Sequence, residues 1–500
     1  MTGGLAPAFA AVLGIFLLGI AYGSREVAQL AKRDPDVMGR AILVQLAVAA
    51  LAGLGLLPLV AWLATIRTGV AQTAVMLGVY FIARSWGMVL PYLAHLGIRA
   101  GSNAGRNVSW LYLANIAGSA TGSILTGFVL LEILPLVSVA RVLALYSVLT
   151  IAMLYLCVSG RMPTASMSGP VLQPAFVRMP AIVLGAMAFV VLLMFPFDRK
   201  EIVARLMLRE RVAQTPKLAV VHESRSGIIT VDKKGEVWGN GMYDGKFNTS
   251  LFPDTNGARR PFALSLFHPS PRHVLMIGLS TGSWAKIIAN NPHVVSLTVI
   301  EISRGYAELI AGQPQVRSIL SNPKVKLIVD DGRRWMRANP DRKFDFVVQN
   351  TTWHFRANIA NLLSKEYLAM VGHRLKPGGV FFFNTTHSPR VQRTACSVFP
   401  HGFRYNNHMA VSRRALNPDF QRWRRTLLSY RIDGVRVVDL AKEHHRQGLA
   451  RLMSFKTHLA HPGGKTEIET CRSVLDRTAG RVLITDDNMG TEWRYPFGLK

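Results

Sequence analysis

A short glycine-containing turn and a later carboxylate are the residues whose types and spacing predict chemistry most directly. Gly278 and Gly282 bound the turn, Ser280 and Thr281 lie between them, and Glu301 follows 19 residues after Gly282. A glycine turn lets a ligand approach the backbone, and an acid about 20 residues later can accept hydrogen bonds from ribose hydroxyls. Because the turn lacks the full Gly-x-Gly-x-x-Gly pattern, it favours a single nucleoside over NAD.

A parallel sheet would bring these residues together. From Pro271 onward, short apolar runs alternate with helical stretches; the runs cover residues 272–278, 296–300, 325–329, 344–349 and 380–384. Strands that alternate with helices predict a doubly wound parallel sheet, in which ligands bind beyond the carboxyl ends of the strands. Asp331 and Gly332 follow the third run and therefore join the candidate binding residues.

The composition divides the chain into an apolar part and a basic part. Half of the 500 residues are hydrophobic and 17% are charged, with a mean hydropathy of +0.23, which excludes a disordered chain and argues against a wholly soluble one. The net charge is +29, of which residues 199–500 carry +23. The three cysteines are too few and too scattered for a disulfide framework or a zinc cluster, which agrees with a reducing compartment and predicts no metal site.

Six stretches in the apolar part are long enough to cross a bilayer as helices, which takes about 20 residues. They are residues 5–22, 41–66, 70–98, 108–133, 136–158 and 181–197. We therefore predict a multi-span transmembrane domain at 1–198, a β-rich lead-in at 199–265 and a nucleoside-binding domain at 266–500.

Two features of the membrane half have competing interpretations. Gly118 and Gly122 have the four-residue spacing that lets helices pack closely in lipid, which we favour over a transport pathway. Arg84 lies inside a hydrophobic span, where a charge is costly; it marks a functional site, snorkels to the interface or breaks an overlong segment.

Two lines of reasoning give opposite orientations in the membrane. The positive-inside rule, applied to six spans, places the large domain outside the cytoplasm. A nucleoside cofactor requires the reverse. We follow the cofactor and expect a multi-pass protein of the inner cell membrane with a cytoplasmic soluble domain.

An ordered series of motifs between residues 225 and 390 resembles the spermidine synthases, a family within the Rossmann-like methyltransferase class. The motifs are Val274–Gly282, Val299–Glu301, Val329–Gly332, Phe344–Val348, Leu363–Tyr367 and Leu375–Gly379. The membrane half is similar to the multi-span region of bacterial membrane-fused members. The expected fold is an N-terminal all-α transmembrane bundle followed by a C-terminal α/β Rossmann-like, methyltransferase-type doubly wound sheet with a small preceding β region.

The resemblance also implies a co-substrate, decarboxylated S-adenosylmethionine or S-adenosylmethionine, and no metal. The residues that would bind it are Gly278, Ser280, Thr281, Gly282, Glu301, Asp331 and Gly332. Glu301 would hold the ribose, and the Asp331-Gly332 pair would border the adenine.

Three positions depart from the pattern of the synthases. Thr281 stands where they carry an acid, and Asn256-Gly257 falls on their tyrosine–histidine pair. After the fourth strand they carry Asp-Ser-Ser/Thr-Asp, whose first Asp is the general base, whereas this chain has Asn350-Thr351-Thr352-Trp353. A diamine is doubly cationic and must lose a proton before it attacks, and an amide cannot accept that proton.

We therefore expect Asn350 to orient the acceptor and His354 to act as the base, with a surface or gate-loop role for His354 as an equal alternative. Asp244, Asp330 and Asp487 are further candidates, and His387 is a less favoured one.

Aminopropyl transfer to a polyamine is the expected reaction. The alternatives are methyl transfer to another acceptor, lipid or anionic, and a non-catalytic nucleoside-binding or transport-associated module. Basic runs such as Arg422-Trp423-Arg424-Arg425 lack a nucleic-acid-binding fold and favour contact with anionic lipid headgroups over a merely solvated surface. The partners expected are thus the bilayer and a small amine or other acceptor, with the oligomeric state left open.

Overall fold

The computed structural model describes residues 5–32, 35–98, 101–158, 198–209, 217–351, 353–454 and 468–493. The chain divides into two compact units, Phe9–Ile228 and Ile229–Lys500.

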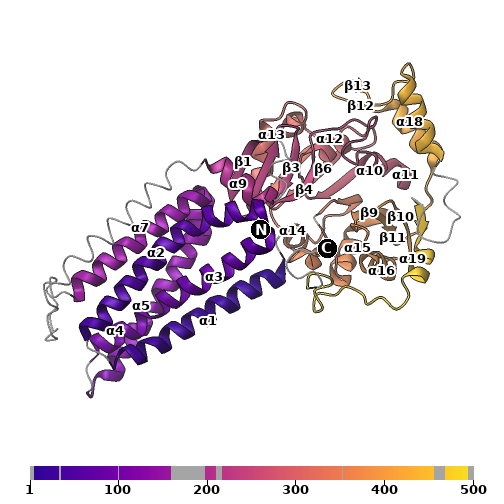
Figure 1. Cartoon of the computed structure of the whole chain (residues 1–500). Helices are drawn as coiled ribbons and strands as arrows, with labels where there is room; N and C mark the ends of the chain where they lie inside the picture. The colour runs from indigo at the N-terminus through magenta and orange to yellow at the C-terminus, as the bar shows by residue number, and fades with distance from the viewer. Residues whose placement is uncertain are drawn as a thin grey trace. The chain divides into compact units, whose positions relative to one another are not determined.

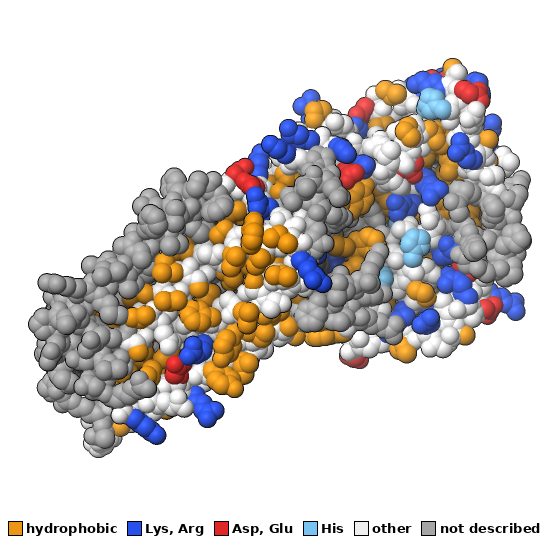
Figure 2. All heavy atoms as spheres, viewed as in Figure 1, with side chains coloured by type: hydrophobic (Ala, Val, Ile, Leu, Met, Phe, Trp, Pro, Cys, Tyr) orange, Lys and Arg blue, Asp and Glu red, His pale blue; other side chains and the backbone are white. Residues whose placement is uncertain are grey.

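Long apolar helices make up most of the first unit (Figure 1). The helices are α1 (Ala6–Leu30), α2 (Pro35–Ile66), α3 (Thr68–Gly87), α4 (Val89–Gly97), α5 (Ala104–Ile124), the π-helix η1 (Leu125–Leu130), α6 (Leu131–Ile133), α7 (Leu136–Val158) and α9 (Arg199–Leu208). Figure 2 shows hydrophobic side chains gathered over the visible face of these helices.

Five helical segments are long and apolar enough to cross a membrane. They are Ala6–Leu30, Ala41–Ile66, Thr68–His95, Ala104–Ile133 and Leu136–Leu156. These segments overlap the first five predicted spans, because an uninterrupted apolar run is readable from composition alone. The sixth predicted span, 181–197, lies outside the described residues.

Close helix packing in this unit involves different glycines from the predicted ones. A Cβ atom at Gly23 of α1 would lie 1.9 Å from the carbonyl oxygen of Arg84 in α3, so only glycine allows this approach. For Gly118 and Gly122, no described atom lies within 4 Å of such a Cβ. The four-residue spacing by itself did not reveal which helix face is covered.

Arg84 has an acidic partner on the neighbouring helix. Its Nη2 lies 2.6 Å from Oε2 of Glu26 in α1, and both side chains are about one quarter exposed. An ion pair compensates a charge that a hydrophobic span would otherwise bury alone. This pairing is a structural role that none of the three sequence interpretations included.

A small sheet precedes the larger one. It has the order β1 (Leu218–Ser224), β2 (Gly227–Asp232), β3 (Glu236–Gly239) and β4 (Met242–Lys246). The segment predicted as a β-rich lead-in thus begins with helix α9 and continues as this sheet.

An eight-stranded sheet forms the centre of the second unit, in the order β14-β10-β11-β9-β8-β5-β6-β7. The strands are β5 (His273–Ile277), β6 (Ser296–Glu301), β7 (Val325–Val329), β8 (Phe344–Gln349), β9 (Leu375–Asn384), β10 (His401–Tyr405), β11 (His408–Ser412) and β14 (Ile468–Thr470). The five predicted strands, β5 to β9, pair in parallel. The predicted parallel sheet is therefore confirmed for these five strands, and β11, β10 and β14, which were not predicted, extend it with antiparallel pairs.

Helices cover both faces of this sheet (Figure 1). The described helices of this unit are α10 (Arg259–Phe262), α11 (Leu264–Phe267), α12 (Ser283–Ala289), α13 (Arg304–Ala311), α14 (Gly332–Ala338), α15 (Lys365–Arg374), α16 (Pro389–Val398), α17 (Phe420–Ser429), α18 (Glu443–Met453) and α19 (Cys471–Arg477). The unit also contains the short 3₁₀ segments η4 (Arg317–Ser321) and η5 (Ile359–Leu362). A separate two-stranded ribbon consists of β12 (Arg431–Ile432) and β13 (Val435–Arg436).

Alternate strand residues belong to two separate hydrophobic cores. In β9, Phe382 packs in a core with residues of α12 and α17, whereas Phe381 and Phe383 pack in a core with residues of α14, α15 and α16. A strand buried on both faces reads as a continuous apolar run, which is why the sequence predicted these strands well. The α/β fold class is confirmed, with a mixed rather than parallel sheet.

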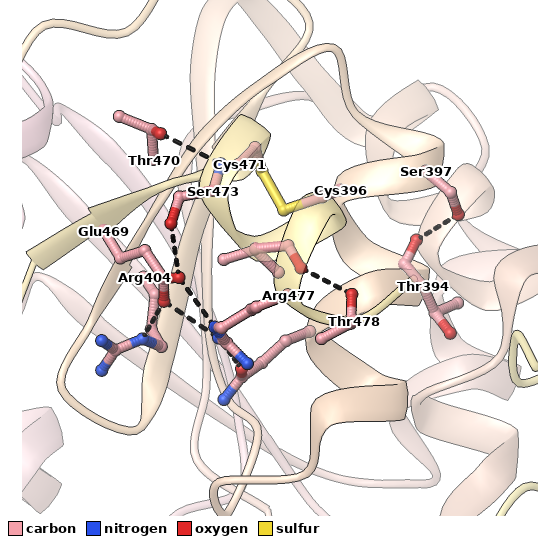
Figure 3. The surroundings of a disulfide bond; sticks show 12 residues. Thr394, Cys396, Ser397, Arg404, Glu469, Thr470, Cys471, Ser473, Arg477 and Thr478 are labelled. Atoms are coloured by element: carbon pink, nitrogen blue, oxygen red, sulfur yellow. Dashed lines mark hydrogen bonds and ion pairs between the residues drawn. A yellow bond between two sulfur atoms is a disulfide. The ribbon is translucent and has the colours of Figure 1, made fainter. Parts of the chain in front are cut away.

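The antiparallel edge carries a disulfide bond between Cys396 of α16 and Cys471 of α19, 75 residues apart. The three cysteines, predicted to be too few and too scattered for a disulfide framework, thus include one bonded pair that the sequence analysis did not predict. Figure 3 shows the adjoining buried cluster, in which Glu469 accepts hydrogen bonds from Arg404 and Arg477, each at 2.7 Å. The disulfide and these ion pairs hold β10, β14 and α19 together across distant parts of the chain.

Candidate functional site

A cavity of about 230 Å³ lies at the carboxyl ends of the parallel strands β5, β8 and β9. Its walls come from the turn after β5, the segments after β8 and β9, strand β4, helices α10 and α12 and the β10–β11 turn. This is the edge of the sheet at which the strand pattern predicted a ligand.

The glycine turn forms one wall of the cavity. Gly278 and Gly282 both have positive φ, +89° and +74°, and a Cβ at Gly282 would lie 2.7 Å from Cδ1 of Ile310. Ser280 also has a positive φ, and its hydroxyl donates a 2.6 Å hydrogen bond to the carbonyl oxygen of Asp244 in β4. Gly278, Ser280 and Thr281 line the cavity, whereas Gly282 begins α12 behind it.

The structure brings Glu301 to this turn. Its carboxylate accepts hydrogen bonds from the backbone N–H of Leu279 at 2.7 Å and of Ser303 at 2.8 Å. The side chain is 5% exposed, and burial raises the pKa of the carboxyl group above its ordinary value against the lowering effect of these bonds. Each carboxylate oxygen has a second lone pair, so Glu301 can still accept a hydroxyl hydrogen bond.

Asp331 and Gly332 lie at the start of α14 and outside the cavity lining. The Asp331 carboxylate caps the helix by accepting the N–H of Arg334 at 2.7 Å. A Cβ at Gly332 would lie 2.8 Å from Cγ2 of Ile277, so this position needs glycine for close packing against β5. Both residues therefore have a local structural role in addition to any contact with the adenine of a nucleoside.

Asn350 lines the cavity directly after β8. Its backbone N–H donates to the carbonyl oxygen of Ile277 at 3.3 Å, and its Oδ1 accepts from Nδ2 of Asn384 at 3.2 Å. Trp353 also lines the cavity and stacks on Phe355. The end of β8 therefore presents amides and an aromatic ring where the synthase pattern has carboxylates.

His354 does not line the cavity. Its Nδ1 lies 2.7 Å from the hydroxyl of Thr491, and burial lowers its pKa to about 4. His387 does line the cavity, and its pKa is lowered by burial and then by Arg404 and Arg260. Both imidazoles are thus neutral, weak bases at neutral pH.

Asp244 is the carboxylate that the cavity wall contains. It lies in β4, accepts a hydrogen bond from the hydroxyl of Tyr306, and burial raises its pKa. A raised pKa makes a carboxylate a better proton acceptor near neutral pH. Of the candidate acids, this one is positioned to act in the cavity.

The other two candidate acids have structural surroundings. Asp330 pairs with Arg334 in the next helix, and Asp487 is exposed. The adjacent Asp486 binds Arg333 at 2.8 Å and accepts the hydroxyl of Ser364 at 2.6 Å. Asp486 therefore connects α14 and the start of α15 to the C-terminal segment.

Arg260 is the main wall residue that sequence reasoning missed. Its Nε donates to the carbonyl oxygen of Gly257 and its Nη1 to Oδ1 of Asn407, each at 3.1 Å. The guanidinium also lies 5.1 Å from the centre of the Trp284 ring. No local pattern marks Arg260 or Asn407, but Asn384 ends a predicted strand and could have been found by the strand-end rule.

Asn256 lines the same wall and holds strand β4 in place. Its Oδ1 accepts the N–H of Lys246 at 2.9 Å, and its Nδ2 donates to the carbonyl oxygen of Lys246 at 2.7 Å. Within the described ranges, no group of three or more His, Cys, Asp or Glu side chains is arranged to hold a metal ion.

Comparison with known proteins identifies a domain that contains the glycine turn, Glu301 and Asn350, whereas Asp244, Arg260 and Asn407 lie outside the matched range. Residues 263–399 match the family model described as the spermine/spermidine synthase domain. The chain is 28% identical over 141 residues to a polyamine aminopropyltransferase of Desulforudis audaxviator, covering 27% of this chain and 50% of that protein. It is 30% identical over 114 residues to a spermidine synthase of Dictyostelium discoideum, covering 23% and 39%.

The chain therefore spans about half the length, or less, of these curated relatives. A crystal structure of spermidine synthase from Thermotoga maritima is similar with a TM-score of 0.35 and 18% identity, covering 47% of this chain and 88% of that one. The matched motifs identify a spermidine synthase-like domain, as the sequence resemblance indicated.

Proposed function

We propose that the spermidine synthase-like domain transfers a group from an adenosyl sulfonium to a small acceptor. The expected form of the reaction is aminopropyl transfer from decarboxylated S-adenosylmethionine to an amine. The observation that carries the proposal is the direct contact between the glycine turn and Glu301 beside the cavity, inside the stretch that matches the domain model.

In this proposal the nucleoside lies at the ends of β5 and β6. Glu301 accepts the ribose hydroxyls, and the turn from Gly278 to Thr281 leaves room for the backbone to approach the ligand. Asp331, at the start of α14, borders the adenine.

The chemical step is a displacement at the carbon beside sulfur. The acceptor nitrogen forms a bond to that carbon, the carbon–sulfur bond breaks, and its electron pair neutralises the sulfonium. The amine proton passes to Asp244, and Asn350 orients the nitrogen through its amide oxygen. Positioning the two reactants supplies much of the acceleration in such a step.

Product analysis tests the proposal. The purified full-length chain is offered decarboxylated S-adenosylmethionine or S-adenosylmethionine together with putrescine or a membrane extract, and products are identified by mass spectrometry. Release of 5′-methylthioadenosine with an aminopropylated product is the expected result. Formation of a methylated product and S-adenosylhomocysteine would show that the reaction is methyl transfer and not aminopropyl transfer. Nucleoside binding without turnover would favour a non-catalytic module.

We also propose that the chain resides in the cell membrane, with its basic surface near anionic headgroups and the α/β domain in the cytoplasm because of the nucleoside co-substrate, although the Cys396–Cys471 disulfide favours the opposite side. Disulfides persist mainly in oxidising compartments, so Cys396 and Cys471 report on the side of the membrane. Thiol alkylation in intact cells, followed by mass spectrometry, decides between the sides. Free thiols at both positions support the cytoplasm, and a bonded pair places the domain outside it.

A further inference from the structure

The charged groups in the cavity wall are one acid and one base. Among the described lining residues, Asp244 carries the carboxyl group and Arg260 the guanidinium, and burial lowers the pKa of His387. The position after β8 that would add a second acid carries Asn350. This wall differs from one built to hold a dication.

Asp244 and Arg260 do not form an ion pair with each other. Asp244 is bound by the hydroxyl of Tyr306, and Arg260 by Asn407 and the carbonyl oxygen of Gly257. These hydrogen-bond partners are neutral, and the nearby opposite charges are Arg356 for Asp244 and Asp254 for Arg260, so a ligand group of opposite sign would add to a charge that is only partly compensated. A carboxylate on a guanidinium forms charge-assisted, often bidentate hydrogen bonds.

The positive field in the cavity extends beyond Arg260 itself. After burial and Arg404, Arg260 is a cause of the lowered pKa of His387, which lines the cavity. Arg356 is close enough to Asp244 to lower the pKa of that carboxyl group, although burial outweighs it. A diamine would bring two positive charges to a wall with one carboxyl group, whereas an amino-carboxylate would bring one positive and one negative charge.

We propose that this cavity recognises an amino-carboxylate, with its amine at Asp244 and its carboxylate at Arg260. The inference rests on the proposed function, because it names the chemical class of ligand in the same cavity. The amino-carboxylate has two sources: an acceptor that carries both groups, or the methionine moiety of S-adenosylmethionine itself as donor.

The displacement balances in either case. With such an acceptor, its amine nitrogen bonds to the carbon beside sulfur, the carbon–sulfur electron pair goes to sulfur, and the amine proton goes to Asp244. The carboxylate at Arg260 is unchanged. With S-adenosylmethionine as donor, an acceptor nitrogen bonds to the carbon beside sulfur, the carbon–sulfur electron pair goes to sulfur and the acceptor's proton goes to solvent water, because Asp244 holds the donor's ammonium. The transferred group keeps its own amine and carboxylate.

Two binding arms distinguish the sources without requiring turnover. In the first, isothermal titration calorimetry on the full-length chain compares 4-aminobutanoate with putrescine in the presence of 5′-methylthioadenosine. These two probes have the same four-carbon length and differ by a carboxylate in place of one amine. In the second arm, S-adenosylmethionine is compared with decarboxylated S-adenosylmethionine, which differ by the carboxylate of the donor.

The expected result is at least tenfold tighter binding of the carboxylate-bearing probe in one arm. Arg260→Gln should remove that preference, while Arg259→Gln on the same helix, which lies outside the cavity lining, should keep it. Asn407→Asp is a second variant. It places a carboxylate where Asn407 now accepts a hydrogen bond from Arg260, so the charge of Arg260 is compensated without removing its side chain. This variant should also weaken binding of the carboxylate-bearing probe. Thermal unfolding checks that each variant is folded.

The outcomes separate this inference from the proposed function. Equal or tighter binding of putrescine and of decarboxylated S-adenosylmethionine, in both arms of the wild-type chain, overturns the inference alone. A preference that survives Arg260→Gln and Asn407→Asp in folded protein also overturns it. Failure of 5′-methylthioadenosine and both donors to bind overturns the proposed function, and the inference with it.

Discussion

The two sides of the cavity are built in different ways. On the side at β5, the turn of residues 278–281 lines the cavity, and Glu301 at the end of β6 accepts a backbone hydrogen bond from this turn without lining the cavity itself. The opposite side is assembled from separate segments, including Asp244, Arg260, Asn350 and Asn407. Only the first side keeps the residues expected of a spermidine synthase-like domain.

This difference indicates that donor and acceptor recognition can change independently. A nucleoside is held by a backbone turn and an acid at a fixed strand end, so few substitutions are compatible with it. Acceptor contacts are single side chains on unrelated elements, and each can be replaced without altering the sheet. Under the proposed function, the turn after β5 and Glu301 would serve the nucleoside, and the altered residues on the opposite side would serve the acceptor.

The largest expected effect is on the acceptor side, at Asp244. Asp244→Asn should lower kcat about 10²–10³-fold, the range for loss of a general base, and leave donor affinity within about threefold. The base must be ionised, so wild-type activity rises with pH through the raised pKa of Asp244, above the range of an ordinary aspartate. Steady-state kinetics against pH should show that this limb disappears in the variant.

The exposed Asp341→Asn is the matched control and should keep both rate and pH profile. An unchanged kcat in Asp244→Asn would mean that the proton leaves by another route.

The next effect tests the nucleoside side. Glu301→Gln should weaken 5′-methylthioadenosine binding about thirtyfold, or about 2 kcal/mol, because a charged acceptor is replaced by a neutral one. Calorimetry measures the affinity. Glu308→Gln on the exposed side of α13 is the control, and equal affinities for the two variants would remove Glu301 from the ribose.

A smaller effect is expected when one of the missing carboxylates is restored at position 350. Asn350→Asp adds a carboxylate to the cavity wall and should raise kcat/KM for putrescine about tenfold, since a nearby negative charge favours a dication. Asn384 can still donate its hydrogen bond to the new side chain. A fall in putrescine turnover would show that the acceptor side is not limited by charge.

The smallest effect on activity is expected at His354, which lies outside the cavity lining. His354→Gln should change kcat less than about twofold. The pKa of His354 in the folded chain is about 4, below its ordinary value of 6.5, so its contribution to stability is present above pH 6.5 and is lost as the pH falls towards 4. Thermal unfolding between pH 7 and pH 4 should therefore show a shallower loss in the variant. A large fall in kcat would instead indicate that His354 accepts the proton in the reaction.

Much of the fold was predictable because its signals are local. Five apolar segments and five parallel strands are continuous, mostly apolar runs in the sequence, so each can be recognised without knowledge of its partners. Strands β10, β11 and β14 were missed because they do not alternate with helices in the predicted pattern and their antiparallel pairing joins residues as far apart as Phe403 and Thr470. The same reason applies to Cys396 and Cys471, whose spacing gives no indication of contact.

The candidate site divides in the same way. The sequence alone determined the glycine turn, Glu301 and the absence of an acid at Asn350, because strand order and strand ends are written along the chain. Only the tertiary structure placed Asp244 in the cavity, removed His354 from its wall and brought in Arg260 and Asn407. Side chains on distant elements meet through packing, and packing depends on the whole chain rather than on local spacing.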